Sequence, residues 1–318
     1  MPESKIELSK KTATILASEL SWSSEKTLVF TGDGRHVVEF PEGFPLLWKA
    51  YRLSRDVHLS PSYHDYLEIV YFYEGSAVFH VGEREYSCTR GDVVIIGDTE
   101  FHYLETNPNE ILKYLNLYFM PELIYEAGSD EAGLEYLKPF FGHSSGFSHR
   151  IPSALVQRSS IPERLVTIYR ELRDQEEYYR LAVKNHLREI LLWLLRHYRH
   201  RSPSLEAYNA KKRNIKRLGG VFRFLQANYQ DSITLEKVAE AACMSSSYFC
   251  RFFKNVTGHT YTDYLSRLRV DKAKELLLRS ELPVTAVGLE VGFESHSYFD
   301  RVFKRFTGKS PQEYSKNQ

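Results

Sequence analysis

Two short segments near the C-terminus carry the same basic and hydroxyl side chains at the same positions, 50 residues apart. They are Ser245–Gly258, which reads SSSYFCRFFKNVTG, and Ser295–Gly308, which reads SHSYFDRVFKRFTG. Each holds an arginine followed three residues later by a lysine. Both side chains bind phosphate groups, and arginine also binds guanine through two hydrogen bonds. The repeat therefore predicts a protein that contacts nucleic acid at two equivalent places.

Both segments have the spacing of amphipathic helices. The residues predicted to pack into a core recur at intervals of three and four positions, and they are Phe249, Phe252, Phe253, Phe299, Val302 and Phe303. A single arginine on the other face would be explained as part of a solvated charged surface, but repetition at one register favours contact with bases. The predicted DNA-binding residues are Ser246, Ser247, Cys250, Arg251, Lys254, Ser295, His296, Ser297, Asp300, Arg301 and Lys304.

We call the predicted helices of Ser245–Gly258 and Ser295–Gly308 the reading helices. The elements beside them fix their positions. Short helical patterns at 235–242 and 284–291 precede them, each followed by a tight turn, which is the helix-turn-helix arrangement. Ser245 and Ser295 stand where a helix N-cap is needed. A predicted helix over 261–279 joins the units and would be about 27 Å long. Because adjacent major-groove segments lie about 34 Å apart, such a helix can present both reading helices to one side of DNA.

Residues 213–318 resemble the DNA-binding domain of the AraC/XylS family of bacterial transcription regulators. The second unit carries the family signature at Gly288, Gly292, Phe293, Ser295, Tyr298, Phe299, Arg301, Phe303, Lys304, Gly308, Ser310, Pro311 and Tyr314. The resemblance implies base contacts from Ser247, Cys250, Arg251, His296, Ser297, Asp300 and Arg301. The first unit departs from the family in its small residues Ser247 and Cys250, which leaves Arg251 as its main expected base contact.

The N-terminal half has a different pattern. Residues 28–119 alternate short β-rich runs with Gly, Pro and Asp breaks, which predicts an all-β sandwich or barrel. His64 and Glu68 lie four residues apart, so they share one face of a strand. Imidazole and carboxylate groups with aromatic neighbours suit recognition of a small molecule that carries hydroxyl groups.

Two stretches of this half resemble the two cupin motifs of a small β-barrel. They read H-x3-E-x6-G from His64 and G-x5-G-x4-H from Gly91 to His102. In metal cupins another histidine stands where this chain has Ser62. The resemblance therefore implies an incomplete version of the metal site that His64, Glu68 and His102 would form, and we expect no metal or other cofactor.

Cupin-like domains fused to this DNA-binding domain commonly sense small molecules, often sugars. The ligand-binding residues that we expect are His64, Tyr66, Glu68 and His102, with Trp48 and His80 as further candidates for the pocket wall. The alternative is that these residues are hydrogen-bonded parts of the barrel without a ligand.

The fold expected is a multidomain α+β protein. Residues 1–160 are predicted to form a cupin-like ligand-binding β-barrel. Residues 161–200 form a helical hairpin whose apolar stripe packs on the barrel or pairs with a second subunit in a homodimer. A polar linker follows over 201–212, and an all-α domain with two helix-turn-helix units joined by a long helix occupies 213–318.

Composition and charge agree with this division. The net charge of the 318 residues is +1, but residues 213–318 hold 17 basic and 11 acidic side chains, whereas residues 1–212 hold 25 and 30. A basic domain on an acidic body is typical of nucleic-acid binding. The three cysteines are too few and too scattered for a disulfide framework or a zinc site. The polar N-terminus and short apolar runs favour a cytoplasmic protein without a membrane span.

Together these patterns predict a transcription regulator, most simply an activator, and not an enzyme. Its expected partners are double-stranded promoter DNA, a small-molecule effector such as a sugar, RNA polymerase and a second copy of itself. The alternative is a metal-dependent cupin enzyme with a DNA-binding tail.

Overall fold

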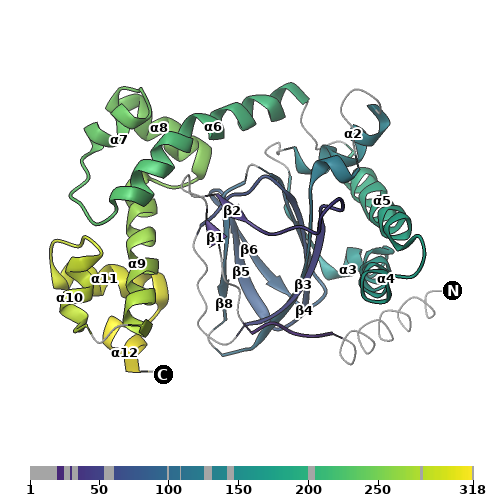
Figure 1. The fold of residues 1–318 in the computed structure, drawn as a ribbon, viewed down its shortest axis with the longest axis horizontal. Coiled ribbons are helices and arrows are strands. Elements are labelled where there is room, and N and C mark those ends of the chain that lie inside the picture. The colour runs from purple at the N-terminus through teal and green to yellow at the C-terminus, as the bar shows by residue number, and fades with distance from the viewer. Residues whose placement is uncertain are drawn as a thin grey trace.

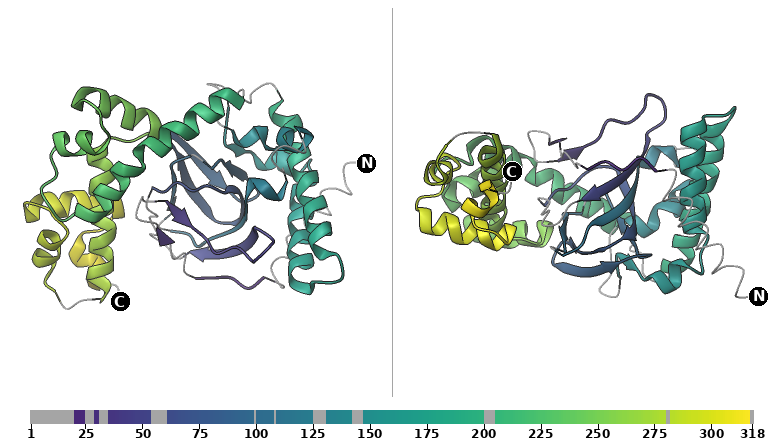
Figure 2. Two further views of the ribbon diagram at one scale, coloured as in Figure 1. Left: turned by 45° about the horizontal axis from the view of Figure 1, so that its top comes forward. Right: turned by 90° about the horizontal axis from the view of Figure 1, so that it is seen from below.

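The computed structural model describes residues 20–24, 29–30, 35–53, 61–98, 100–107, 109–124, 131–141, 147–199, 205–279 and 282–316. A β-domain that holds all the strands lies between two groups of helices (Figure 1). Helices α7 to α12 lie on one side of it, and α4 and α5 lie on the other in both views of Figure 2. Helix α6 runs from the C-terminal group across the end of the β-domain (Figure 1).

The β-domain consists of two main antiparallel sheets, with strand orders β10-β7-β4-β9-β3 and β6-β5-β8. The strands are β3 (Leu46–Leu53), β4 (Leu67–Glu74), β5 (Ser76–Val81), β6 (Arg84–Thr89), β7 (Val93–Ile96), β8 (His102–Thr106), β9 (Leu112–Phe119) and β10 (Arg150–Ile151). A separate short pair is formed by β1 (Val29–Phe30) and β2 (His36–Val37). Gly75 and Gly82 have positive φ angles of 83° and 58°, which the tight turns of both hairpins require.

Alternation along β4 builds two cores, one on each face of the larger sheet. Val70 and Phe72 pack between the two sheets, whereas Leu67 and Ile69 point to the other face and pack beneath the helices. The prediction of Trp48 as a pocket wall is wrong for the same reason. Trp48 lies on the helix-covered face of β3 and its ring packs near Tyr169 of α4, with ring centroids 6.0 Å apart.

The covering helices are α4 (Ile161–Asp174) and α5 (Tyr179–Tyr198), assisted by the short helices α2 (Glu131–Leu137) and α3 (Ser153–Val156) and the 3-10 turns η1 (Pro121–Leu123) and η2 (Lys138–Phe140). Leu187, Ile190, Leu191 and Leu194 of α5 are each 0% exposed in the core beneath the sheet. The apolar stripe was predicted to pack on the barrel or to pair with a second subunit. In the structure it packs against the β-domain.

The C-terminal domain is entirely helical over its described residues. Its helices are α6 (Leu205–Asn228), α7 (Leu235–Ala241), α8 (Ser246–Thr257), α9 (Tyr261–Arg279), α10 (Val284–Glu290), α11 (His296–Thr307) and α12 (Pro311–Lys316). One core joins α6, α7, α8 and the start of α9, and a second joins the rest of α9 with α10, α11 and α12. The two helix-turn-helix units joined by a long helix are thus confirmed.

One boundary differs from the sequence prediction. Residues 201–212 were expected to be a linker because they are polar, but α6 begins at Leu205. The stretch from Leu205 onward is rich in Leu, Glu, Ala and Lys, which have high intrinsic helix propensity. Polarity alone is therefore a poor sign of a linker here. No helix within the described ranges is long and apolar enough to cross a lipid bilayer.

Candidate nucleic-acid interface and ligand site

The reading helices α8 and α11 each bury one face and expose the other. Phe249, Phe253, Phe299 and Phe303 are each 0% exposed, so the predicted core positions are confirmed. The residues predicted to contact DNA are half-buried at Ser246 and Asp300 and exposed at Ser247, Cys250, Arg251, Lys254, Ser295, His296, Ser297, Arg301 and Lys304. The repeat thus forms two accessible polar surfaces on a common helical scaffold.

The two units differ at their N-caps. The Ser295 hydroxyl accepts a hydrogen bond from the backbone N–H of Tyr298 at 3.3 Å, so its side chain is used to start α11. Ser245 occupies the same position before α8, but its side chain makes no cap hydrogen bond. The expected capping is therefore observed in the second unit alone. Gly258 and Gly308 end both helices with left-handed φ angles of 80° and 76°.

The second reading face is organised by contacts between its own side chains. His296 Nδ1 lies 3.0 Å from Asp300 Oδ2, one helical turn away. The Arg301 guanidinium lies over the Tyr298 ring, 5.3 Å from its centroid. These contacts hold an imidazole, a carboxylate and a guanidinium side by side, and all three can contact base edges or phosphates.

Sequence reasoning missed two aromatic residues on these faces. Tyr248 and Tyr298 are 43% and 42% exposed, although large aromatic side chains are usually buried. Both occupy the same place in the repeat, directly before a core phenylalanine. That identity at an outward-facing position was the signal that could have identified them.

Inside the β-domain, His64, Glu68 and His102 come together as the sequence predicts. Glu68 lies on β4, His102 begins β8, and His64 precedes β4. Glu68 Oε2 is 3.2 Å from His64 Nε2 and 3.5 Å from His102 Nε2. All three residues are buried, at 0%, 1% and 6% exposure. Burial lowers the pKa of His64 and favours the neutral imidazole, although the Glu68 carboxylate, which would accept a hydrogen bond from the protonated ring, opposes this shift.

Aromatic and amide side chains surround these three residues. The Tyr66 ring stacks on His64 with centroids 3.7 Å apart, so all four predicted ligand-binding residues lie in one cluster. Asn116 on β9 was missed, because a single asparagine in a strand carries no recognisable motif. Its amide donates to Glu68 Oε1 and to the Tyr118 hydroxyl, both at 2.6 Å. The cluster is therefore a buried polar site within the β-domain.

Comparison with known proteins matches both parts of the chain. A family described as a helix-turn-helix domain matches residues 238–317, and one described as an AraC-like ligand binding domain matches residues 49–191. The chain belongs to the AraC family of transcription regulators. The ligand-binding match contains His64, Glu68 and His102, and the helix-turn-helix match contains both reading helices.

Curated relatives cover most of this AraC-family regulator. The transcriptional activator RhaR of Escherichia coli is 28% identical over 258 residues, which are 79% of this chain and 85% of that protein. The regulator YdeC of Bacillus subtilis is 25% identical over 259 residues, 80% and 85% of the two chains.

Solved structures match most of the chain or its C-terminal part. The C-terminal domain of the response regulator yesN from Fusobacterium nucleatum is 33% identical, and the match covers 34% of this chain and 99% of that one with a TM-score of 0.30. ToxT from Vibrio cholerae, solved with an unsaturated fatty acid, is 14% identical over 88% of this chain and 97% of that one, with a TM-score of 0.45.

In this AraC-family regulator, aromatic side chains of the β-domain pack into the core of the first helix-turn-helix unit. Tyr63 and Phe101 are 6% and 2% exposed and lie 5.5 Å and 5.3 Å, between ring centroids, from Phe222 of α6. Burial of a side chain of this size stabilises a contact by roughly 1.5–3 kcal/mol. Sequence reasoning missed this interface, because each aromatic residue fits the core of its own domain equally well.

A second contact reaches both helix-turn-helix units through Arg267 of α9. Its guanidinium lies between the rings of Tyr103 and Phe306, 4.3 Å and 4.4 Å from their centroids, and donates to the Tyr103 hydroxyl at 2.8 Å. On the other side of Tyr103, the His80 ring stacks at 4.1 Å. His80, predicted as a pocket wall, is thus part of the domain interface.

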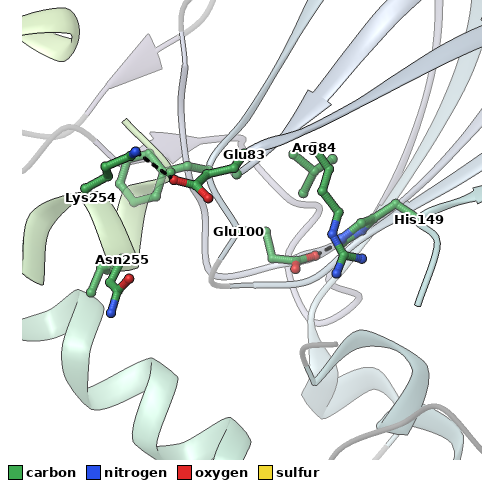
Figure 3. A pocket seen from close by; sticks show the side chains of 11 residues that line it. Glu83, Arg84, Glu100, His149, Lys254 and Asn255 are labelled. Carbon is green, nitrogen blue, oxygen red and sulfur yellow. Dashed lines mark ion pairs between the residues drawn. The ribbon is translucent and has the colours of Figure 1, made fainter. Parts of the chain in front are cut away.

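The β5–β6 turn meets the C-terminal end of the first reading helix. Glu83 forms an ion pair with Lys254, with Oε1 and Nζ 3.4 Å apart (Figure 3). Both side chains are largely exposed, so the pair is worth at most about 1 kcal/mol. The aromatic contacts therefore contribute most of the stability of the domain interface. The ion pair places a carboxylate beside Lys254. A cavity of about 250 Å³ lies beside it between the two domains.

The ligand site and the interface use the same two short segments. His64 and His102 point inward to Glu68, whereas their neighbours Tyr63, Phe101 and Tyr103 contact the C-terminal domain. Alternate residues of extended chain face opposite sides, which explains the arrangement. Residues of the inner site are therefore direct chain neighbours of interface residues.

Gly258 provides a test of this docking. A Cβ there would lie 2.4 Å from the Gly82 carbonyl carbon, whereas a Cβ at Gly308 would have no neighbour within 4 Å. We expect Gly258→Ala to separate the domains, because two backbones cannot approach so closely with a methyl group between them. Small-angle X-ray scattering should show a larger radius of gyration.

Gly308→Ala is the matched control for this prediction. It carries the same left-handed backbone cost of about 1–3 kcal/mol, since both glycines end a reading helix with nearly equal φ angles. Its radius of gyration should equal that of the wild-type protein. Equal values for both variants would contradict the close contact.

Proposed function

We propose that this AraC-family protein activates transcription by binding promoter DNA with α8 and α11 and engaging RNA polymerase. The observation that carries the proposal is the repeated exposed face, which presents Arg251 and Arg301 at equivalent positions of two helix-turn-helix units. Activation is supported by the similar protein named as the activator RhaR. The second face, with His296, Asp300 and Arg301, is the chemically richer one and supplies most of the base recognition.

The effector proposed for the β-domain is a small hydroxyl-rich molecule such as a sugar. The site lies among buried groups that donate and accept hydrogen bonds, including Glu68, Asn116 and Tyr118. Within the described residues, Asn116 Oδ1 is buried without a hydrogen-bond partner, which favours a ligand that donates to it. The aromatic side chains of Tyr66 and Tyr118, with ring centroids 5.1 Å apart, border this site.

Effector binding is proposed to control DNA binding through the domain interface. In the docked arrangement the Glu83 carboxylate lies beside Lys254, a residue of the first reading face, and repels DNA phosphates. Docking therefore favours the form with lower DNA affinity. An effector that shifts His64 and His102 also shifts their neighbours Tyr63 and Phe101 at the interface, and so favours the undocked form.

Accordingly, Gly258→Ala should bind DNA more tightly than Gly308→Ala, and equal affinities would argue against this mechanism.

A homodimer is also proposed, but through residues other than the predicted stripe. The apolar side chains of α5 that face the β-domain are already buried within one chain. Tyr178 and Leu181, where α5 begins, are 68% and 59% exposed and remain available to a second copy.

The rival proposal is a metal-dependent cupin enzyme with a DNA-binding tail. One observation favours it, namely the convergence of two histidines and a carboxylate. The curated relatives are transcription regulators, and we therefore propose a sensing domain that does not turn over its ligand. Conversion of many molecules of a small substrate per chain by the purified protein would support the enzyme instead.

Arg251→Ala and Arg301→Ala test the reading faces. Each should weaken binding by about 1–3 kcal/mol to DNA fragments that the wild-type protein selects from a random library, measured by fluorescence anisotropy. Arg173→Ala removes the same charge from an exposed position on α4 and should bind normally. Wild-type affinity in both reading-face variants would show that the faces are assigned wrongly.

A thermal-shift screen tests the effector class. A sugar at 100 times its dissociation constant should stabilise the protein by about 2.7 kcal/mol, because it binds the folded state alone. Asn116→Leu should abolish the shift. If neutral sugars give no shift while fatty acids or other apolar molecules do, the proposed effector class is incorrect.

Sedimentation velocity of the full chain tests the dimer. We expect a dimer at micromolar concentration, and Leu181→Glu should dissociate it because a charge replaces an exposed apolar contact. A wild-type protein that sediments as a monomer would refute the homodimer.

A further inference from the structure

We propose that His64, Glu68 and His102 bind a divalent first-row transition-metal ion inside the β-domain. The inference goes beyond the proposed regulator and does not depend on the nature of its effector. The sequence led us to expect no metal, because Ser62 replaces one histidine of the metal cupins. Three protein ligands are nevertheless enough to bind an ion whose remaining positions are filled by water.

The distances between Glu68 and the two histidines are close to those between two ligands of one ion. Glu68 Oε2 lies 3.2 Å and 3.5 Å from the two imidazole Nε2 atoms, and the ligand atoms all lie within 4.8 Å of one another. Two ligands about 2.1 Å from one ion, at angles between about 90° and 109°, are about 3.0–3.4 Å apart. The described histidine, cysteine and acidic residues form no other three-membered group of this kind.

The hydrogen bonds of the two imidazoles select the tautomer that a metal requires. His64 Nδ1 lies 2.8 Å from the Tyr66 carbonyl oxygen, and His102 Nδ1 lies 2.9 Å from the Glu100 carbonyl oxygen. A carbonyl oxygen can only accept, so each Nδ1 carries the proton and donates it. In the neutral ring, each Nε2 then presents a lone pair. Backbone carbonyls commonly orient metal-binding histidines in this way.

The same tautomers leave an electrostatic conflict without a cation. Both Nε2 lone pairs face the same Glu68 oxygen, which is itself an acceptor. A single proton can bridge this oxygen to only one of the imidazoles, whereas one metal ion accepts all three lone pairs together. Burial makes the conflict more costly, because water cannot enter to separate the acceptors.

A further side chain orients the carboxylate. Asn116 donates to Glu68 Oε1 at 2.6 Å and thereby turns Oε2 toward the two histidines. The amide is neutral, so it fixes the carboxylate without competing as a cation. Two imidazole nitrogens among three ligands favour iron, zinc, cobalt or nickel over magnesium and calcium, which prefer oxygen ligands.

The test begins with full-length protein from which metal has been removed with a chelator. Calorimetric titration with Zn²⁺ and Co²⁺ should show one ion bound per chain, and Mg²⁺ should not compete. The bound Co²⁺ should give a visible absorption spectrum, and the metal should raise the unfolding temperature. No effector or DNA is present, so this result is independent of the proposed regulation.

Variants locate the ion within the protein. His64→Gln and His102→Gln should lose stoichiometric binding, whereas Asn116→Leu should retain it with about 10- to 100-fold lower affinity. His149→Gln is the matched control, because His149 is a buried histidine paired with the buried carboxylate of Glu100 at 3.4 Å in the same domain. Circular dichroism of each metal-free variant shows whether it has folded.

Two outcomes would overturn the site. One is wild-type protein that binds neither Zn²⁺ nor Co²⁺ above one tenth of an equivalent. The other is binding that persists in folded His64→Gln and His102→Gln variants but disappears when Cys243 and Cys250 are replaced by serine, which would place the metal on these exposed thiols.

Discussion

The burial of Tyr63 and Phe101 against Phe222 is the contact on which the arrangement of the whole chain depends. It joins the β-domain to the first helix-turn-helix unit with aromatic surface and leaves the ion pair between Glu83 and Lys254 as a minor contribution. Because the two aromatic residues are direct neighbours of His64 and His102, they also tie the interface to the buried polar site. The residues that face the buried polar site and those that face the C-terminal domain therefore belong to the same two short segments.

The reading helices satisfy two demands with one sequence. Each buries its phenylalanines in a core built on α9 and turns its polar residues outward, so packing determines how these polar side chains are presented. The N-terminal end of α9 belongs to the first core and the remainder to the second. Its Arg267, held between Tyr103 and Phe306, extends the same support to the β-domain. Domain docking and the placement of the two reading helices are consequently coupled through a single helix.

Much of the fold could be predicted because it follows from local patterns. The bounds expected for α8, α9 and α11 are those observed, since helical spacing, serine N-caps and glycine C-caps all act within a few residues. The start of α6 was mistaken because polar composition was given more weight than helix propensity. The cluster of His64, Tyr66, Glu68 and His102 was found through its motif spacing, whereas Asn116 was missed because a lone polar residue in a strand has no distinctive spacing. Tyr248 and Tyr298 were missed although they repeat at one position of both units, because large aromatic side chains are usually buried.

The sequence by itself determined that the chain has two helix-turn-helix units with polar outer faces, and that histidine and glutamate side chains share one face of a β-domain. These properties depend on the 3.6- and 2-residue periods of helix and strand, which can be recognised from the spacing of residues along the chain. The tertiary structure alone decided that Tyr63 and Phe101 face the C-terminal domain, that the α5 stripe is used within one chain, and that both Nε2 atoms face one carboxylate oxygen. Such contacts join residues far apart along the chain, and their partners depend on packing that no local period encodes.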